Sequence, residues 1–396
     1  MRSRLWARAA LMLGLLAAPQ GASAAVRAVF VGIDLYLHSR AREPSAEFED
    51  LSGAVGDTLR VRAAMAQALA LPLAAPGTGC DWRDAVSQTL INQCATRDRI
   101  LRAWDDAIAA SARGDTLVLY FAGHGSRYLE KGGEQASRYN STLMPTDARD
   151  PASDTGTDIL DREVRRVIDL ATSRGIRVVT LFDSCNSGTA SRDGQSASRT
   201  APELRNVALP PEAPQAGFGQ GSAWRVHIGA AADGQDAKEV GSVGNRAGVF
   251  STALAKALVA MPHTSFADLA ARVSAEVTAA TGGRQTPHAE GALRASFDGP
   301  EVKLPTFAVV AGSNGLVMDG GQLLGVTRGS RFALFATTSD ALQAGRMAML
   351  GTARVAAVAP AMAQLALEPG AGAALPPRLV AVEISHDHGG RVIGLA

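Results

Sequence analysis

Two polar motifs, each directly after a run of apolar residues, contain side chains suited to nucleophilic catalysis. His124 lies between two glycines after residues 116–121, and Cys185 follows residues 176–182. A thiolate is a strong nucleophile, and a neighbouring imidazole can take up its proton and pass it to a leaving group. Either residue alone is more often structural, but together at two strand ends they indicate a cysteine hydrolase.

The apolar runs predict the sheet that would bring these motifs together. Short apolar runs alternate along the chain with segments of helical periodicity. The predicted strands cover 26–33, 116–121, 176–182 and 225–229, and the predicted helices cover 57–69, a segment after Thr96, 160–172, 248–259 and 265–280. This alternation is typical of an α/β fold with a mostly parallel sheet covered on both faces. Ligands bind at the carboxyl ends of such strands, where both motifs lie.

Three further segments differ from this pattern. Residues 71–96 read as a loop, in which Cys80 and Cys94 could form a disulfide if the compartment is oxidising. Residues 191–221 are rich in Gly, Pro, Ser and Gln and predict a mobile linker. Residues 305–396 predict a small all-β module, for which a small barrel is one architecture, and its role is unknown.

Composition and the amino terminus limit the classes of function. Lys and Arg number 39 against 38 Asp and Glu, so the charge gives no reason to expect a nucleic-acid or membrane-surface protein. Residues 1–24 have the basic, apolar and small-residue order of a signal peptide, and no later run is long enough to span a membrane. We expect an exported protein, periplasmic or secreted. Its third cysteine, Cys185, is then unpaired and a candidate reactive thiol.

The two motifs resemble the catalytic signatures of metacaspases, within the caspase-like cysteine peptidases. The matching residues are Tyr120-Phe-Ala-Gly-His124-Gly125 and Asp183-Ser-Cys185-Asn-Ser-Gly188, with further matches in the family's order from Val31 to Pro287. The resemblance covers roughly residues 26–297 and implies a caspase-type doubly wound domain within 25–304. The Q-A-C-x-G signature of true caspases is absent, and the C-terminal module lies outside the resemblance.

The family's mechanism implies roles for individual residues. Cys185 would attack a peptide carbonyl, His124 would transfer the proton, and the N–H groups of Gly125 and Cys185 would form the oxyanion hole. The resemblance also implies that Asp57 and Asp183 line the primary specificity pocket, although Asp57 could instead cap a helix. Two carboxylates would favour cleavage after Arg or Lys.

The resemblance raises two regulatory questions. Many metacaspases need calcium. Asp161 could match one ligand, but the position seven after the nucleophile is Arg192, so we expect activity without calcium or another metal cofactor.

Caspase-like chains are often cut between the two halves of the domain, and the linker here holds arginines. We predict self-cleavage after Arg199 or Arg205.

Two alternatives remain open at this point. One is a catalytically idle caspase-like scaffold whose C-terminal module binds a partner, and the other is a clostripain- or gingipain-type cysteine peptidase. Intact His124 and Cys185 argue against the scaffold. The order of the flanking segments favours the metacaspase reading, with a peptide or protein as substrate.

Overall fold

The computed structural model describes most of the chain. The described residues are 24–75, 77, 79–130, 138–152, 157–185, 197–204, 223–232, 234–242, 244–297, 299, 306–312, 315–342, 348–370 and 375–387. The predicted signal peptide lies outside them except for Ala24. Within these ranges, no helix has the length and apolar content that crossing a membrane requires.

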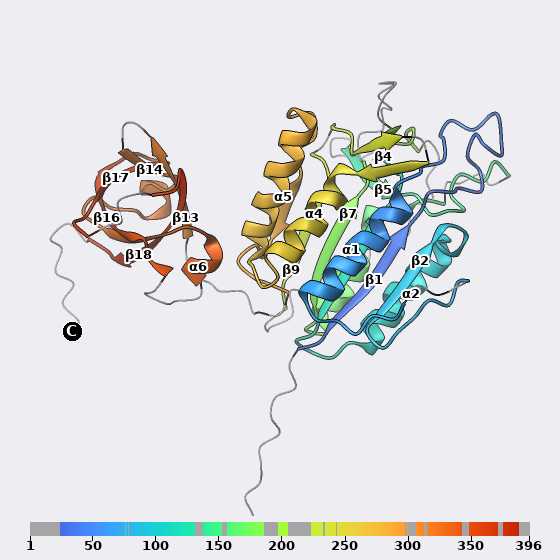
Figure 1. Cartoon of the computed structure of the whole chain (residues 1–396), viewed down its shortest axis with the longest axis horizontal. Coiled ribbons are helices and arrows are strands. Elements are labelled where there is room, and N and C mark those ends of the chain that lie inside the picture. The colour runs from blue at the N-terminus through green and yellow to red at the C-terminus, as the bar shows by residue number, and fades with distance from the viewer. Residues whose placement is uncertain are drawn as a thin grey trace, which may run out of the picture.

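A six-stranded sheet forms the centre of the N-terminal part (Figure 1). Its order is β12 (His288–Gly291), β9 (Arg225–Gly229), β7 (Arg177–Asp183), β3 (Thr116–Ala122), β1 (Val26–Gly32) and β2 (Ser87–Ile91). All neighbours pair in parallel except β12, which runs antiparallel to β9. The predicted strands form because their residues are apolar on both faces, as a sheet covered by helices requires.

Helices cover both faces of this sheet. They are α1 (Ala54–Ala68), α2 (Arg97–Ala110), α3 (Asp161–Ser173), α4 (Val249–Ala260) and α5 (Phe266–Thr281). In Figure 1, α1, α4 and α5 lie side by side in front of the sheet, and α4 contacts both of the others. α2 contacts α3 and the strands β1, β2 and β3. The expected α/β architecture with a doubly wound sheet is therefore confirmed.

Two segments predicted to be irregular contain strands. β2 and the short 3-10 helix Asn92–Cys94 fall within the predicted loop 71–96. Part of the predicted linker forms β8 (Ala197–Ser198), which pairs with β10 (Lys238–Ser242). The prediction of a mobile linker is therefore wrong for residues 197–204, because long-range pairing supplies the order that the local sequence does not.

Two small sheets lie beyond the carboxyl ends of the central strands. One contains β8, β10 and β11 (Asn245–Gly248), and the other contains β4 (Gly125–Glu130), β5 (Arg138–Leu143) and β6 (Ile159–Leu160). β4 begins immediately after His124, so one of these sheets borders the candidate site.

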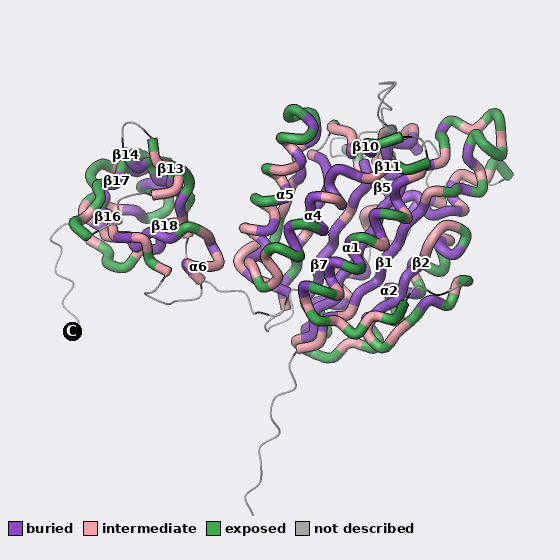
Figure 2. Tube along the Cα trace, viewed as in Figure 1, coloured by how far each residue is buried: buried purple, intermediate pink, exposed green. Residues whose placement is uncertain are grey.

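The C-terminal module is a closed antiparallel barrel. Its strands are β13 (Thr306–Gly312), β14 (Gly315–Met318), β17 (Ala363–Leu367), β16 (Gly351–Val358), β15 (Arg331–Phe335) and β18 (Arg378–Ser385) in barrel order. The barrel has a buried core of its own, visible in Figure 2, apart from the core of the central sheet. This confirms the all-β module.

One carboxylate joins the barrel to the central domain. Asp268, in the first turn of α5, accepts hydrogen bonds from the main-chain N–H groups of Thr338 and Ser339 at 2.9 and 2.7 Å. Those two residues begin the short helix α6 (Thr338–Leu342), which packs on β15 and β18. The barrel is thereby anchored through the start of α6.

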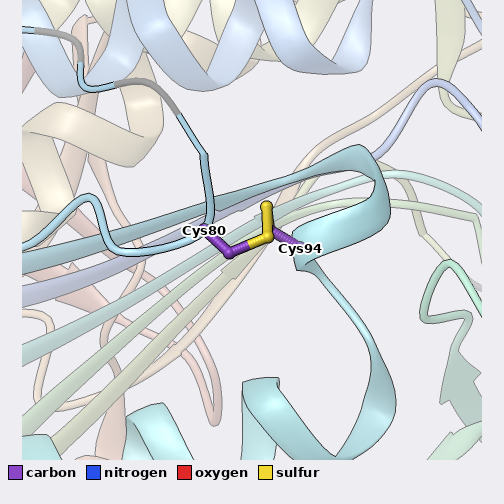
Figure 3. Close-up of a disulfide and its surroundings, with 2 residues drawn as sticks. All are labelled: Cys80 and Cys94. Carbon is purple, nitrogen blue, oxygen red and sulfur yellow. A yellow bond between two sulfur atoms is a disulfide. The ribbon is translucent and has the colours of Figure 1, made fainter.

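Cys80 and Cys94 form a disulfide between the start of the β2 region and the 3-10 helix (Figure 3). Their Cα atoms are 5.0 Å apart. The bond closes a loop at the edge of the sheet, and Cys185 is the free cysteine.

Candidate active site

The sheet places His124 and Cys185 at the ends of neighbouring strands. Ala122 of β3 lies opposite Asp183 of β7, and each candidate catalytic residue follows that pair by two positions. A Cβ on Gly125 would stand 2.1 Å from the carbonyl oxygen of Cys185. Only glycine permits this approach, so the two motifs meet at one edge of the sheet.

The loop between β1 and α1 holds the His124 ring. Its Nε2 lies 2.8 Å from the carbonyl oxygen of Glu49, and Tyr36 and Phe48 pack against the ring with centroids 5.1 and 5.7 Å away. A carbonyl only accepts, so Nε2 carries the proton and Nδ1 keeps its lone pair. Nδ1 is buried and has no hydrogen-bond partner in the described part of the chain. Burial lowers the pKa of His124, while the hydrogen bond with the Glu49 carbonyl acts to raise it. The pKa is lowered overall, so the ring is neutral and can accept a proton.

The thiol of Cys185 is also buried. Its Sγ accepts a hydrogen bond from the main-chain N–H of Ala237, and it lies 3.8 Å from the hydroxyl of Ser198. Burial raises the pKa of the Cys185 thiol to about 11, although these contacts act in the opposite direction. With residues 197–204 in place, the resting pair is a neutral thiol and a neutral imidazole.

The side chain of Arg199 fills a buried pocket lined by carboxylates. Nη1 lies 2.8 Å from Asp183, and Nη2 lies 3.0 Å from Glu239. Asp57 also pairs with Nη2, and Arg199 has no exposed surface. Three carboxylates around one guanidinium form a site that favours a cation and opposes an acidic side chain.

The floor of this pocket is glycine. A Cβ on Gly248 would stand 2.5 Å from Asp183 and 2.6 Å from Asp57, so no larger residue fits beneath the carboxylates. Ser251 of α4 donates its hydroxyl to Asp183 at 2.5 Å. Burial raises the pKa of Asp183 to about 6, with Arg199 opposing the shift and Asp57 adding to it.

The main chain around Arg199 lies extended across the site. The carbonyl oxygen of Arg199 accepts a hydrogen bond from the N–H of Gly125 at 2.9 Å, and its N–H donates to the carbonyl of Ala237 at 3.2 Å. On the other side, the N–H of Ala201 donates to the carbonyl of Gly125 at 2.9 Å. The main chain on both sides of Arg199 is thus held by strand-like hydrogen bonds. Extended peptides bind proteins in the same way when they add a strand to the edge of a sheet.

The remaining sequence-predicted residues lie elsewhere. Asp161 accepts a hydrogen bond from the Tyr128 hydroxyl at 3.0 Å and pairs with Arg165 at 3.0 Å. Arg192 and Arg205 lie outside the described residues. No group of three possible metal ligands stands together in the described part.

Sequence reasoning missed three residues of the site. Glu239 is the third carboxylate of the pocket, Glu49 orients His124 through its main chain, and the Tyr36 hydroxyl accepts the His124 main-chain N–H at 2.7 Å. A main-chain carbonyl leaves no signature in the residue type. Glu239 lies two residues after the segment 229–237, which matches the family, so its position beside that segment was the signal that could have identified it.

Sequence comparisons connect this geometry with a known family. Residues 26–192 match the model of the metacaspase peptidase C14 domain. Metacaspase-1B of Aspergillus oryzae is 33% identical over 95 residues, which are 24% of this chain and 22% of that protein. Metacaspase-1 of Scheffersomyces stipitis is 28% identical over 116 residues, 28% of each chain. The match therefore spans about a quarter of the length of these relatives.

Solved structures resemble the chain more weakly. A protein from Geobacter sulfurreducens aligns with a TM-score of 0.47 at 18% identity, covering 70% of this chain and 97% of its own. Caspase-1 from Spodoptera frugiperda aligns with a TM-score of 0.39 at 10% identity, covering 68% of this chain and 86% of its own. Residues 26–192 of this chain are therefore similar to the metacaspase peptidase C14 domain.

Proposed function

We propose that this protein is a cysteine endopeptidase that cleaves after Arg or Lys, and that it cleaves itself between Arg199 and Thr200. The observation that supports this most directly is the position of Arg199. Its guanidinium occupies the acidic pocket while its carbonyl oxygen meets the N–H of Gly125. Of the two predicted cleavage positions, this geometry favours Arg199.

The reaction needs only groups already at the site. The Sγ of Cys185 attacks the carbonyl carbon of Arg199, and its proton passes to Nδ1 of His124. The N–H of Gly125 stabilises the oxyanion. The bond between Arg199 and Thr200 breaks as His124 returns the proton to the Thr200 nitrogen. Water then hydrolyses the thioester, which frees the carboxylate of Arg199 and restores the thiol.

The acidic pocket supports the basic specificity. Once Arg199 leaves, Asp57, Asp183 and Glu239 would face one another without a counter-charge. A substrate Arg can satisfy several of these carboxylates through its planar donors, whereas Lys presents a single ammonium. We therefore expect Arg to be preferred over Lys, and Asp to be rejected.

Intact mass spectrometry tests self-cleavage. Wild-type protein should yield two fragments with a junction after Arg199, while Cys185→Ala and Arg199→Ala should keep that bond intact. Cleavage that persists after Arg199 in Cys185→Ala would assign it to a contaminating protease. A single uncut mass in all three proteins would remove self-cleavage but not the peptidase assignment.

Fluorogenic peptides and a peptidyl electrophile test the peptidase itself. Peptides ending in Arg, Lys and Asp should be cleaved in that order of rate, with the Asp peptide near background. Covalent labelling at Cys185 distinguishes an enzyme from an idle scaffold. If the electrophile labels Cys185 only in denatured protein, the peptidase proposal is wrong and the hypothesis of an idle scaffold is favoured.

Calcium independence remains part of this proposal. Asp161 already contacts Tyr128 and Arg165. Activity of chelator-treated enzyme should change less than about twofold when calcium is added, and a large gain in rate would overturn the prediction.

The Cys80–Cys94 disulfide supports export into an oxidising compartment, since such bonds are rare in reducing ones.

A further inference from the structure

A cavity on the other face of the sheet contains two histidines that the proposed mechanism does not use. The cavity has a volume of about 660 Å³ and is lined by residues of β7, β9, β12 and α3. Phe182 and Ser184 line it, whereas Asp183 between them lines the Arg199 pocket. Because successive side chains of a strand point to opposite faces, the cavity and the candidate active site lie on opposite sides of β7.

The strand register brings three metal-binding side chains onto this face. His227 of β9 lies opposite Glu290 of β12, and His288 lies opposite Gly229. Residues opposite each other in an antiparallel pair share a face, as do residues two apart along one strand. His227, His288 and Glu290 therefore share one face, and all three line the cavity.

Glycine allows the two imidazoles to approach each other. A Cβ on Gly229 would stand 2.2 Å from Cε1 of His288, so the His288 ring lies over this residue. The centroids of the His227 and His288 rings are 5.0 Å apart. With a Zn–N bond of about 2.0 Å and a tetrahedral angle, two coordinated imidazoles have centroids roughly 5 Å apart. The observed separation fits that geometry.

The hydrogen bonds of both rings leave the same nitrogen available. His288 Nδ1 lies 3.0 Å from the carbonyl oxygen of Ala231, so Nδ1 donates and Nε2 keeps a lone pair. His227 Nδ1 lies 2.8 Å from the Thr180 hydroxyl, which can accept the Nδ1 proton while donating to the Val226 carbonyl 3.4 Å away; this tautomer leaves the Nε2 lone pair available. Metal-binding histidines typically donate their second N–H to such oxygens.

We infer that His227, His288 and Glu290 form a binding site for a divalent transition-metal ion of the zinc type, distinct from the Cys–His pair. The two imidazole Nε2 atoms are the first ligands. No three such groups already stand together in the described residues, so the exposed Glu290 side chain must rotate to complete the set. Water would occupy the fourth position, as in zinc sites with three protein ligands.

Calorimetric titration of the full chain with Zn²⁺ tests the site. Cys185→Ala should serve as the background because a thiol beside His124 would bind zinc itself. We expect one ion per chain and a thermal midpoint that rises with zinc, because an ion that binds only the folded state stabilises it. Replacing His227 or His288 by Ala should weaken binding by about tenfold or more, since one of three protein ligands is lost. Glu290→Gln should weaken it less, because the two imidazoles remain.

Two matched controls locate the ion. His263 is exposed outside the cavity, and His263→Ala should leave zinc binding unchanged. His124→Ala in the same background should also retain it. Loss of binding in His124→Ala, or unchanged binding in both cavity variants, would overturn the inference. If either Ala variant fails to fold, His227→Gln and His288→Gln replace it, with the visible spectrum of bound Co²⁺ as a second measure of imidazole coordination.

Discussion

Arg199 is a fully buried cation whose charge is balanced by side chains from three different elements. Asp57 belongs to α1, Asp183 to β7 and Glu239 to β10. Transferring such charges out of water is costly, and removing one partner of a buried ion pair leaves the others uncompensated. The arrangement therefore makes the stability of the uncut chain depend on one residue.

Replacing Arg199 by Met should destabilise the uncut protein by about 3–5 kcal/mol. The comparison should use the Cys185→Ala background, so that no cleavage occurs, and urea unfolding as the measurement. Arg272→Met is the matched control, because its ion pair with Glu276 is exposed and is worth about 1 kcal/mol or less. Equal losses of unfolding free energy in the two variants would show that the buried Arg199 ion pairs stabilise the protein no more than an exposed pair does.

Glu239 should contribute to recognition of a substrate arginine. It accepts hydrogen bonds from both Nε and Nη2 of Arg199. A hydrogen bond to a charged group contributes about 1.5–3 kcal/mol, so Glu239→Gln should lower kcat/KM for an Arg peptide by roughly 10–100-fold. Glu276→Gln on the exposed side of α5 is the control. An unchanged kcat/KM in Glu239→Gln would place this carboxylate outside the specificity pocket.

Residue types predicted part of the site. His124 and Cys185 could be identified because few residues perform nucleophilic chemistry and both follow apolar runs. Arg199 was named as one candidate within a linker, but its burial depends on contacts with distant elements. Glu49 acts through a main-chain carbonyl that every residue type has, so no sequence pattern could have indicated it.

At the scale of elements, the β2 region depends on a covalent link. The Cys80–Cys94 bond joins residues 14 apart and encloses a segment that the sequence marks as irregular. In the chain-entropy model, a loop of this size gives about 3 kcal/mol of stabilisation. β2 itself is an edge strand, paired only with β1 among the named strands.

Replacing both Cys80 and Cys94 by Ala should lower the free energy of unfolding by about 2–4 kcal/mol. Urea unfolding measures the change, again in the Cys185→Ala background so that no other thiol reacts. Adding a reductant should destabilise the parent protein by a similar amount and leave the double variant unaffected. A reductant effect of equal size in both proteins would rule out this bond as its cause.

Elements with continuous apolar runs were predictable and polar ones were not. Residues 225–229 were predicted as a strand and coincide with β9, and Thr96 precedes α2 as expected. The sequence did not predict β2, β8 and β12, because their residues include Ser, Gln, His and Glu. These segments become strands through pairing with neighbouring strands. Such edge strands are specified by pairing more than by their own composition.

At the scale of the molecule, two separate cores are connected by the contacts of Asp268. Its carboxylate binds the start of α6, and it also accepts a hydrogen bond from the hydroxyl of Ser265, the N-cap of α5. The Asp268 carboxylate thus lies at the first turn of both α5 and α6 and helps to hold the barrel beside α5 (Figure 1). The contacts of Thr264 and Ser265 with the Ser339 hydroxyl hold it there as well.

Asp268→Ala should loosen the barrel without unfolding it, because the barrel retains its own core. We expect the radius of gyration in solution to increase and proteolysis between the two parts to become faster. Small-angle X-ray scattering and limited proteolysis measure these changes. Glu276→Gln, on the same helix, is the control, and identical scattering from both variants would show that other contacts hold the barrel.

The segment that fills the active site is tethered close to the nucleophile. Ser198, next to Arg199, follows Cys185 by only 13 residues. A short tether gives the attached group an effective concentration of order millimolar at its site, far above that of most protein substrates. External peptides would therefore compete poorly until this segment is cut and released. Cleavage within one chain also predicts a half-time that stays constant when the protein is diluted a hundredfold, whereas cleavage between molecules would slow in proportion.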